Sequence, residues 1–304
     1  MIACCSNPRR FARRYELFVD FQRRMEATAG ISLYCIECAF GTRPFEVTSA
    51  DNPRHVQVRS SEELWVKENL INVAAQRLPF GWRYMAWIDG DVEFLNPHWV
   101  TDTIHALHHY PVVQLFQQAI DIGPKYETLQ VQQSFGYMYH RNEHHPAKTH
   151  LETRSPYEAW HPGFAYAVTR KAFDILGGLL DFAVLGAGDH HMALAFIGQV
   201  GKSDPKNVSA GYTRQLKIYG ERAKQAVGGC LGYVHGTILH YFHGKKANRR
   251  YVERWQILKE ARFDPETDLA KDYQGVIRLS VDNPSLRLGI GRYFTQREED
   301  SIDT

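Results

Sequence analysis

The sequence predicts an α/β fold in which helices flank a twisted, mostly parallel sheet. Short apolar segments alternate with amphipathic ones in the order βαββαβ, with more strands and helices after them. The strand-like segments also read as apolar runs, which is typical of a sheet covered on both faces. A length of 304 residues favours one large domain with an extension. We therefore predict a main domain over residues 1–245 and a helical C-terminal extension over 246–304 packed on it.

The first half of the chain supplies four predicted strands and two helices. Residues 2–5, 31–40 and 54–59 are the first three strands, and a helix with apolar side chains on one face follows residue 10 and closes at Gly30. Ser60 and Glu63 match a capping box, which predicts a helix from there to Leu78. Residues 84–88 form a buried strand that ends at Asp89.

The second half continues the alternation after a strand at 111–116. Residues 121–160 are long and polar, so we expect a lid or binding loop, or a disordered segment. A helix over 169–176 has Thr169 as its cap, and a second over 190–197 places Asp189 at or near its start. A strand over 236–242 then delivers His240 and His243 to an end rich in glycine, lysine and arginine.

Composition excludes some classes of protein and leaves others open. No apolar run approaches the roughly 18 residues that span a bilayer, and the basic residues at the start follow a very short apolar run, the reverse of a signal peptide. We expect a soluble, cytoplasmic protein. The five cysteines are expected to be buried free thiols. The formal charge of +2 conceals basic clusters near both ends, which indicate solvated helix faces or an anionic ligand.

Asp89 and Asp91 are the strongest functional signal, because they follow a buried strand directly. The ligand crevice of an open α/β sheet lies beyond the carboxyl ends of its strands. Residues at i and i+2 of an extended chain point the same way, which suits two oxygen ligands on one Mg²⁺ or Mn²⁺ ion. A histidine ligand such as His240 would favour manganese. Chance and helix capping produce the same short pattern.

A divalent ion at this place suits a nucleotide-sugar substrate, whose diphosphate leaving group it neutralises. Four motifs, taken in their order along the chain, resemble those of the GT-A glycosyltransferases: WIDGDVEF (87–94), HPGFAYA (161–167), GAGDHH (186–191) and LHYFHG (239–244). ENLINVA (68–74) is similar to the helix before the aspartates in the β-1,4-galactosyltransferases. The resemblance implies a GT-A, Rossmann-like sheet.

A closer resemblance is to the phage and bacterial glycosyltransferases related to the base J-associated glucosyltransferase. LWVKENLIN (64–72), VVQLF (112–116), LGAGD (185–189) and LHYFHGKKANRRY (239–251) carry it. It implies transfer of a sugar, from a UDP-sugar above all, to a 5-hydroxymethylpyrimidine such as hydroxymethylcytosine in DNA, by a bacteriophage-type enzyme acting in the host cytoplasm. A glycan or lipid acceptor, a metal-dependent nucleotidyltransferase and a non-catalytic binding module stay open. The oligomeric state is open too.

The resemblance also implies roles for particular residues. Asp91 binds the metal, and Asp89 binds the metal, its water or the ribose. His240 completes the coordination with His243 as its competitor, unless both histidines merely bond backbone carbonyls at a strand end. Asp189 is the general base of an inverting transfer, although the segment lacks a second acid and the aspartate alternatively caps its helix.

The remaining implied contacts are to the two substrates. The donor would be held by Ser6, Asn7, Arg10, Glu37, Glu68, Asn72, Gly163, Gly188, Lys245 and Lys246. The acceptor would be held by Trp160, His190, Arg249 and Arg250. Packing or solvation explains Trp160 and the basic residues equally well.

Overall fold

The computed structural model describes residues 1–142 and 160–302 of the chain, and a seven-stranded sheet forms its centre. The strand order is β11-β6-β10-β4-β1-β2-β3, and all neighbouring pairs are parallel except the two that involve β10. The strands are β1 (Ile2–Ser6), β2 (Tyr34–Phe40), β3 (His55–Ser60), β4 (Tyr84–Ile88), β6 (Val112–Gln114), β10 (Ala165–Thr169) and β11 (Leu231–Tyr233). The predicted α/β class with a mostly parallel sheet is confirmed.

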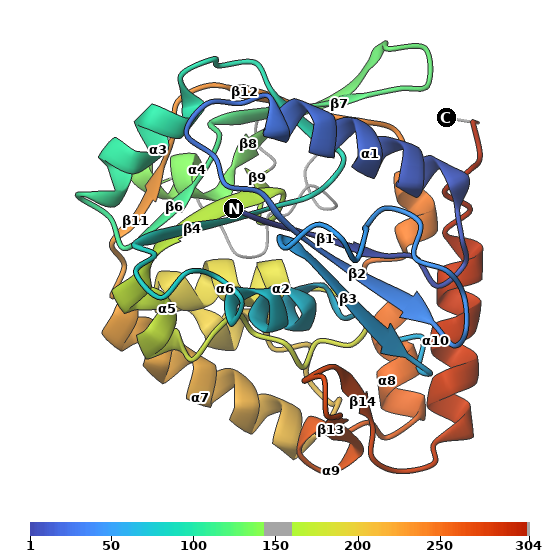
Figure 1. Cartoon of the computed structure of the whole chain (residues 1–304). Coiled ribbons are helices and arrows are strands. Elements are labelled where there is room, and N and C mark those ends of the chain that lie inside the picture. The colour runs from blue at the N-terminus through green and yellow to red at the C-terminus, as the bar shows by residue number, and fades with distance from the viewer. Residues whose placement is uncertain (143–159, 303–304) are drawn as a thin grey trace.

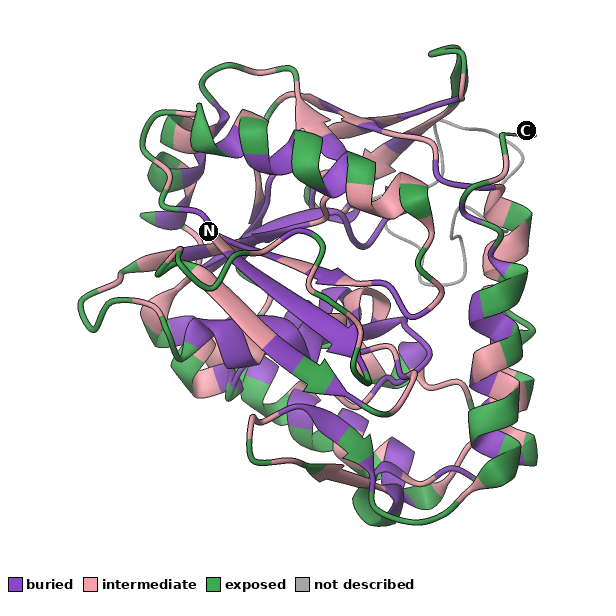
Figure 2. Ribbon diagram, turned by 45° about the vertical axis from the view of Figure 1, so that its right-hand side comes forward, coloured by how far each residue is buried: buried purple, intermediate pink, exposed green. Residues whose placement is uncertain are grey.

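Helices cover both faces of this sheet, as Figure 1 shows. On one face lie α1 (Ala12–Glu26) and α3 (Trp99–Leu107), and on the other lie α2 (Lys67–Ala75), α5 (Arg170–Leu176), α6 (Gly188–Phe196) and α7 (Ala210–Ala226). Successive residues of a strand point to opposite faces, so Ile2 belongs to the core beneath α2 and Ala3 to the core beneath α1. Figure 2 shows the resulting pattern of a buried sheet between helices with exposed outer faces.

A second, five-stranded sheet has the order β5-β12-β7-β8-β9. Its strands are β5 (Val92–Phe94), β12 (Thr237–His240), β7 (Gln118–Ile122), β8 (Thr128–Ser134) and β9 (Trp160–His161). Because β4 belongs to the first sheet and β5 to the second, the chain changes sheets between Ile88 and Val92. The two predicted aspartates lie on that crossing.

The C-terminal part of the chain is mainly helical. It contains η2 (Lys246–Arg249), α8 (Arg254–Glu260), α9 (Pro265–Asp268) and α10 (Pro284–Gln296), with a small hairpin of β13 (Leu269–Lys271) and β14 (Ile277–Leu279). Its apolar residues Leu258, Leu286 and Ile290 share one core with α2 and α7. The shorter elements α4 (Phe135–His140) and η1 (Val200–Ser203) complete the fold.

Two local predictions are wrong. The expected loop over 121–160 contains the end of β7, all of β8 and α4, while residues 143–159 lie outside the described part. The expected capping box fails because β3 continues to Ser60, which pairs with Phe40, and the backbone N–H of Trp65 bonds to Val184. These sheet and loop contacts keep the chain extended, and helix α2 begins only at Lys67.

Other expectations from composition can be checked directly. All five cysteines are free thiols; Cys5, Cys35 and Cys38 are buried as predicted, whereas Cys4 is only half-buried and Cys230 is exposed. Within the described residues, no helix has the length and apolar character needed to cross a membrane.

Candidate metal centre and its cavity

A cavity of about 840 Å³ opens beyond the carboxyl ends of β1 and β4. Ser6 ends β1 and Asn7 follows it, and Asp89 and Asp91 follow β4. Other parts of its wall come from the start of α2, the start of α6, the segment after β12 and the C-terminal residues. The structure therefore places the cavity where the sheet topology predicts a ligand crevice.

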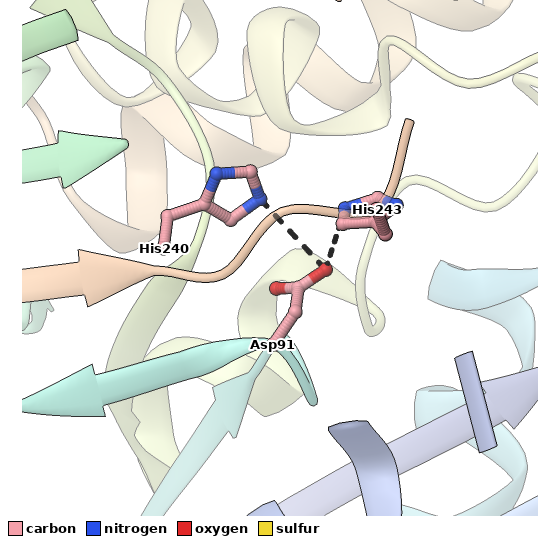
Figure 3. Close-up of side chains that lie close together, drawn as sticks. All are labelled: Asp91, His240 and His243. Atoms are coloured by element: carbon pink, nitrogen blue, oxygen red, sulfur yellow. Dashed lines mark ion pairs between the residues drawn. The ribbon is translucent and has the colours of Figure 1, made fainter. Parts of the chain in front are cut away.

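Asp91, His240 and His243 converge in this cavity, as Figure 3 shows. Asp91 Oδ2 lies 3.0 Å from His243 Nε2 and 3.8 Å from His240 Nε2. One potential ligand atom from each residue lies within 4.8 Å of the others. Ligands with bonds of about 2.1 Å to one ion lie about 3 Å apart when adjacent and about 4.2 Å apart when opposite. The three side chains are thus close to the spacing that a shared ion requires.

Hydrogen bonds set the ring of His240 in an orientation suited to metal binding. His240 Nδ1 lies 2.7 Å from Asp121 Oδ1, so Nδ1 donates its proton to the carboxylate and Nε2 keeps its lone pair toward Asp91. Asp121 is itself held by Gln132 and by an ion pair with Lys246. Burial tends to raise the pKa of Asp121, but His240 and Lys246 hold it well below its usual range. An ionised carboxylate behind a metal-binding histidine is a common arrangement.

The electrostatics of Asp91 also fit a cation. Burial alone would raise the pKa of Asp91, yet His240 and His243 hold it well below its usual range. Asp91 Oδ1 is buried and has no hydrogen-bond partner among the described residues. A carboxylate with an unpaired buried oxygen costs free energy unless a cation compensates it. Two imidazoles and one carboxylate suit Mn²⁺ better than Mg²⁺, so the residues fit the predicted ion.

Asp89 is placed differently from the prediction that both aspartates grip one ion. Its carboxylate forms an ion pair with Lys67 at the start of α2. Its backbone N–H bonds to Phe164, the residue before β10 of the first sheet, whereas the backbone carbonyl of Asp91 accepts from Tyr241, the residue after β12 of the second. Side chains at i and i+2 point the same way only within a continuous strand. The change of sheets between β4 and β5 interrupts the strand at these two aspartates. Asp89 lines the cavity but stands outside the group of three ligands.

Asp189 lines the same cavity as the second residue of α6. A Cβ atom on Gly163 would lie 2.4 Å from Asp189 Oδ2, so only glycine leaves room for this carboxylate. A Cβ atom on Gly188 would similarly lie 2.7 Å from the Glu68 carboxyl carbon. Each glycine therefore leaves space for an acidic side chain: Gly163 for Asp189, and Gly188 for Glu68.

The sequence interpretation treated Asp189 as a lone acid, and the structure adds Glu68 beside it. Glu68 is 4% exposed, and its carboxyl group packs on Gly188, the residue before Asp189. Burial, chiefly, raises the pKa of Glu68 to about 7; Lys67 opposes that rise and the charge of Asp189 adds to it. Glu68 and Asp189 are 121 positions apart, so no local pattern connects them.

Cationic side chains surround the acids. Arg14, Lys67, Arg249, Arg254 and Arg297 all line the cavity. Arg254, Arg297 and the buried Glu299 were not assigned to the site from the sequence, because each reaches it only through the packing of the C-terminal helices. Aromatic residues Trp65, Tyr251, Trp255 and Phe294 line the cavity as well.

Some residues assigned to the donor lie elsewhere. Glu37 is 3% exposed and accepts hydrogen bonds from the backbone N–H groups of residues 46, 47 and 48, so it holds a loop. Asn72 bonds both backbone groups of Leu179. Arg10 pairs with Glu46 at the surface. None of the three lines the cavity.

Among the basic and aromatic residues assigned to the substrates, some line the cavity and others do not. Lys246 supports Asp121 instead of facing the cavity, and neither Lys245 nor Arg250 lines it. Trp160 is fully buried and stacks on His190 at a centroid distance of 5.8 Å, so it orients His190 and does not contact the cavity itself. The assigned residues on the wall are Ser6, Asn7, Glu68, Asp89, Asp91, Asp189, His190, His240, His243 and Arg249.

Comparison with known proteins finds only distant likeness. No protein-family model matches the chain, and no curated protein matches it. A mutant of Drosophila β-1,4-galactosyltransferase 7 in complex with manganese, UDP-Gal and xylobiose has 12% identity and a TM-score of 0.43, over 94% of this chain and 97% of that one. Glucosyl-3-phosphoglycerate synthase from Mycobacterium tuberculosis with Mn²⁺, UDP-glucose and phosphoglyceric acid has 13% identity and a TM-score of 0.38, over 94% and 89%. A putative nucleotide-diphospho-sugar transferase from Desulfovibrio desulfuricans has 10% identity and a TM-score of 0.29, over 79% and 80%.

Proposed function

We propose that this protein is a metal-dependent GT-A glycosyltransferase that moves a sugar from a nucleotide-sugar donor to a hydroxyl acceptor. The observation that carries the proposal is the convergence of Asp91, His240 and His243 in a cavity that also holds Asp189 and several arginines. The motifs WIDGDVEF, HPGFAYA, GAGDHH and LHYFHG, in that order, support the same class.

The donor diphosphate is the natural ligand for the cationic side of this cavity. A bound Mn²⁺ ion would supply Lewis-acid neutralisation of the leaving nucleoside diphosphate. Arg14, Lys67 and Arg249 add positive charge from the cavity wall. Ser6, at the end of β1, and Asn7, directly after it, line the cavity, and in this proposal they contact the nucleoside, which we take to be uridine.

Asp189 is the general base in this proposal. Its carboxylate takes the proton of the acceptor hydroxyl while that oxygen bonds to the anomeric carbon, and the sugar–phosphate bond breaks with its electron pair leaving on the diphosphate. Attack opposite the leaving group inverts the anomeric configuration. Burial, chiefly, raises the pKa of the neighbouring Glu68 to about 7, so below that pH Glu68 is mostly protonated and adds no second negative charge beside Asp189.

We propose a 5-hydroxymethylpyrimidine base in DNA as the acceptor. The aromatic residues Trp65, Tyr251, Trp255 and Phe294 line the cavity and offer flat faces for a flipped base. Lys202, Lys206 and Arg254 also line it and would attract a phosphate backbone. Because these residues include four from positions 251–294, we further propose that the C-terminal extension belongs functionally to the catalytic domain.

The assay combines the protein, Mn²⁺, a panel of UDP-sugars and hydroxymethylcytosine- or hydroxymethyluracil-containing DNA. UDP release together with a hexose or pentose mass increase on the DNA supports the proposal. UDP release that requires an oligosaccharide or lipid in place of DNA leaves the enzyme class standing and replaces the acceptor. Pyrophosphate release from a nucleoside triphosphate instead identifies a nucleotidyltransferase, and tight donor binding without turnover identifies a binding module.

Substitution of Asp189 tests the assignment of the base. Asp189→Asn is expected to lower UDP release by about a thousandfold or more, which corresponds to about 4 kcal/mol of transition-state stabilisation. Mn²⁺ affinity should not change, because Asp189 lies outside the ligand group. Asp174→Asn, on the exposed face of α5, is the matched control. Full activity of Asp189→Asn rules out its role as base.

Two histidines and one carboxylate also hold iron in non-haem oxygenases. That donor set is the specific observation that favours a second function, an Fe²⁺-dependent oxidation. Oxygen consumption with Fe²⁺ in the absence of any nucleotide-sugar would support it. The lysine and arginine side chains around the cavity favour the phosphate-bearing donor instead.

A further inference from the structure

The segment that follows α10 reaches the metal centre with a buried acid. Glu299 is 2% exposed and accepts hydrogen bonds from the guanidinium groups of Arg14 and Arg297. Its Oε2 atom lies 3.6 Å from Nδ1 of His243, longer than a hydrogen bond but within ion-pair range. A residue near the end of the chain is thus the nearest carboxylate on the far side of His243 from Asp91.

Two groups contact the other ring nitrogen of His243 and make opposite demands on it. Arg249 Nη2 lies 2.9 Å and Asp91 Oδ2 lies 3.0 Å from His243 Nε2. An arginine can only donate, so its contact requires a lone pair on Nε2, and the neutral ring then carries its proton on Nδ1. In that tautomer Asp91 and Nε2 both present lone pairs, which is the arrangement that a shared cation requires. That Nδ1 atom is buried and has no hydrogen-bond partner among the described residues. Glu299 is the acceptor that faces it.

His240 has the same arrangement, and in its case the hydrogen bond from Nδ1 to the carboxylate is formed. Its Nδ1 donates to Asp121 at 2.7 Å, and its Nε2 faces Asp91. Each of the two histidines therefore has a buried carboxylate behind Nδ1 and Asp91 in front of Nε2. Asp121 comes from β7, whereas Glu299 comes from the C-terminal segment.

The C-terminal segment is held firmly against the loop that carries His243. A Cβ atom on Gly244 would lie 2.9 Å from the carbonyl oxygen of Glu298 and 3.0 Å from that of Arg297, so the two backbones touch. On its other side, Asp300 accepts hydrogen bonds from the first backbone N–H groups of α1, at Ala12 and Arg13. Glu299 sits between these two attachments, which fixes the position of its carboxylate.

We propose that Glu299 is a positioning residue for the metal centre: it holds the Nδ1 proton of His243 so that Nε2 is directed at the ion. The inference rests on the metal site of the proposed function. Coordination of an ion by Nε2 would replace the hydrogen bond from Arg249, and Glu299 would hold the ring in the same tautomer. The carboxylate is suited to this role because hydrogen bonds from the guanidinium groups of Arg14 and Arg297 fix its position.

Direct Mn²⁺ binding to the full-length chain, measured by calorimetry, tests the proposal. Removal of an acid that orients a metal-binding histidine typically weakens metal affinity about 10- to 100-fold. We expect that range for Glu299→Gln and for the benchmark Asp121→Asn. The exposed neighbour Glu298→Gln should bind within about twofold of wild type. Wild-type affinity in Glu299→Gln, with the expected loss in Asp121→Asn, overturns the role of Glu299.

A measurement on the wild-type protein avoids any folding defect of the variants. Long-range ¹H–¹⁵N spectra of the histidine rings in metal-free protein at pH 8 should show His243 protonated at Nδ1 only. Protonation at Nε2 instead overturns the inference, whatever the variants do. If the wild-type chain binds no Mn²⁺ at all, the metal site of the proposed function fails, and that result is distinct from a failure of Glu299 alone.

Discussion

Glu68, the acid beside the proposed base Asp189, allows a quantitative prediction of how the free energy of unfolding depends on pH. Glu68 is buried in the wall of the cavity, and its pKa is raised from 4.5 to about 7, chiefly by burial. Between these two pH values the folded protein keeps a proton that the unfolded chain loses, so the free energy of unfolding falls as pH rises through this window. A difference of about 2.5 between the two pKa values corresponds to about 3 kcal/mol.

Glu68→Gln mimics the protonated acid at every pH. The variant should therefore escape this loss and gain stability relative to wild type by about 3 kcal/mol between pH 4.5 and pH 8. Urea unfolding of both proteins at several pH values across this range measures the difference. Glu221→Gln, an exposed position on α7, is the control and should show no pH-dependent difference. If Glu68→Gln changes the free energy of unfolding by the same amount at pH 4.5 and at pH 8, the reasoning is refuted.

The remaining predictions separate catalytic from structural roles. Gly163→Ala places a methyl group 2.4 Å from Asp189 Oδ2, so UDP release should fall at least about tenfold while Mn²⁺ affinity stays unchanged, and undiminished turnover would contradict the placement of the base. Asn72→Ala loses two hydrogen bonds to Leu179 and should lower the free energy of unfolding by about 2 kcal/mol, with donor KM unchanged; a raised KM would return Asn72 to the donor site. Asp300→Ala removes the cap of α1 and should cost about 1 kcal/mol in thermal unfolding, and no change would show that water replaces the cap.

The sequence was informative where function depends on the end of a strand. Residues 84–88 and 236–242 were predicted as strands from local patterns, and their ends bring Asp91 together with His240 and His243. Spacing alone did not decide between the two histidines, and the structure places both near Asp91. The helix start at Asp189 was also predictable, because glycines before an apolar helical pattern mark it.

The sequence was uninformative where a contact joins distant segments. Glu37 ends a strand as a ligand-binding acid does, but the loop at 46–48 folds back and uses its oxygens. Asp89 matches the metal-binding pattern, yet Lys67 from another element pairs with it. Glu299 stands among other acidic residues near the end of the sequence, and only packing buries it between two arginines. Each outcome depends on long-range packing, which no local pattern encodes.

Mn²⁺ binding to wild type, to Asp91→Asn and to the matched variant Asp89→Asn tests whether Asp91 holds a metal ion. Electron paramagnetic resonance of free Mn²⁺ during a titration gives stoichiometry and affinity together. Our account predicts one ion per wild-type chain, a loss of affinity greater than about a hundredfold in Asp91→Asn, and a much smaller loss in Asp89→Asn, whose carboxylate pairs with Lys67. Equal affinity in wild type and Asp91→Asn would contradict it.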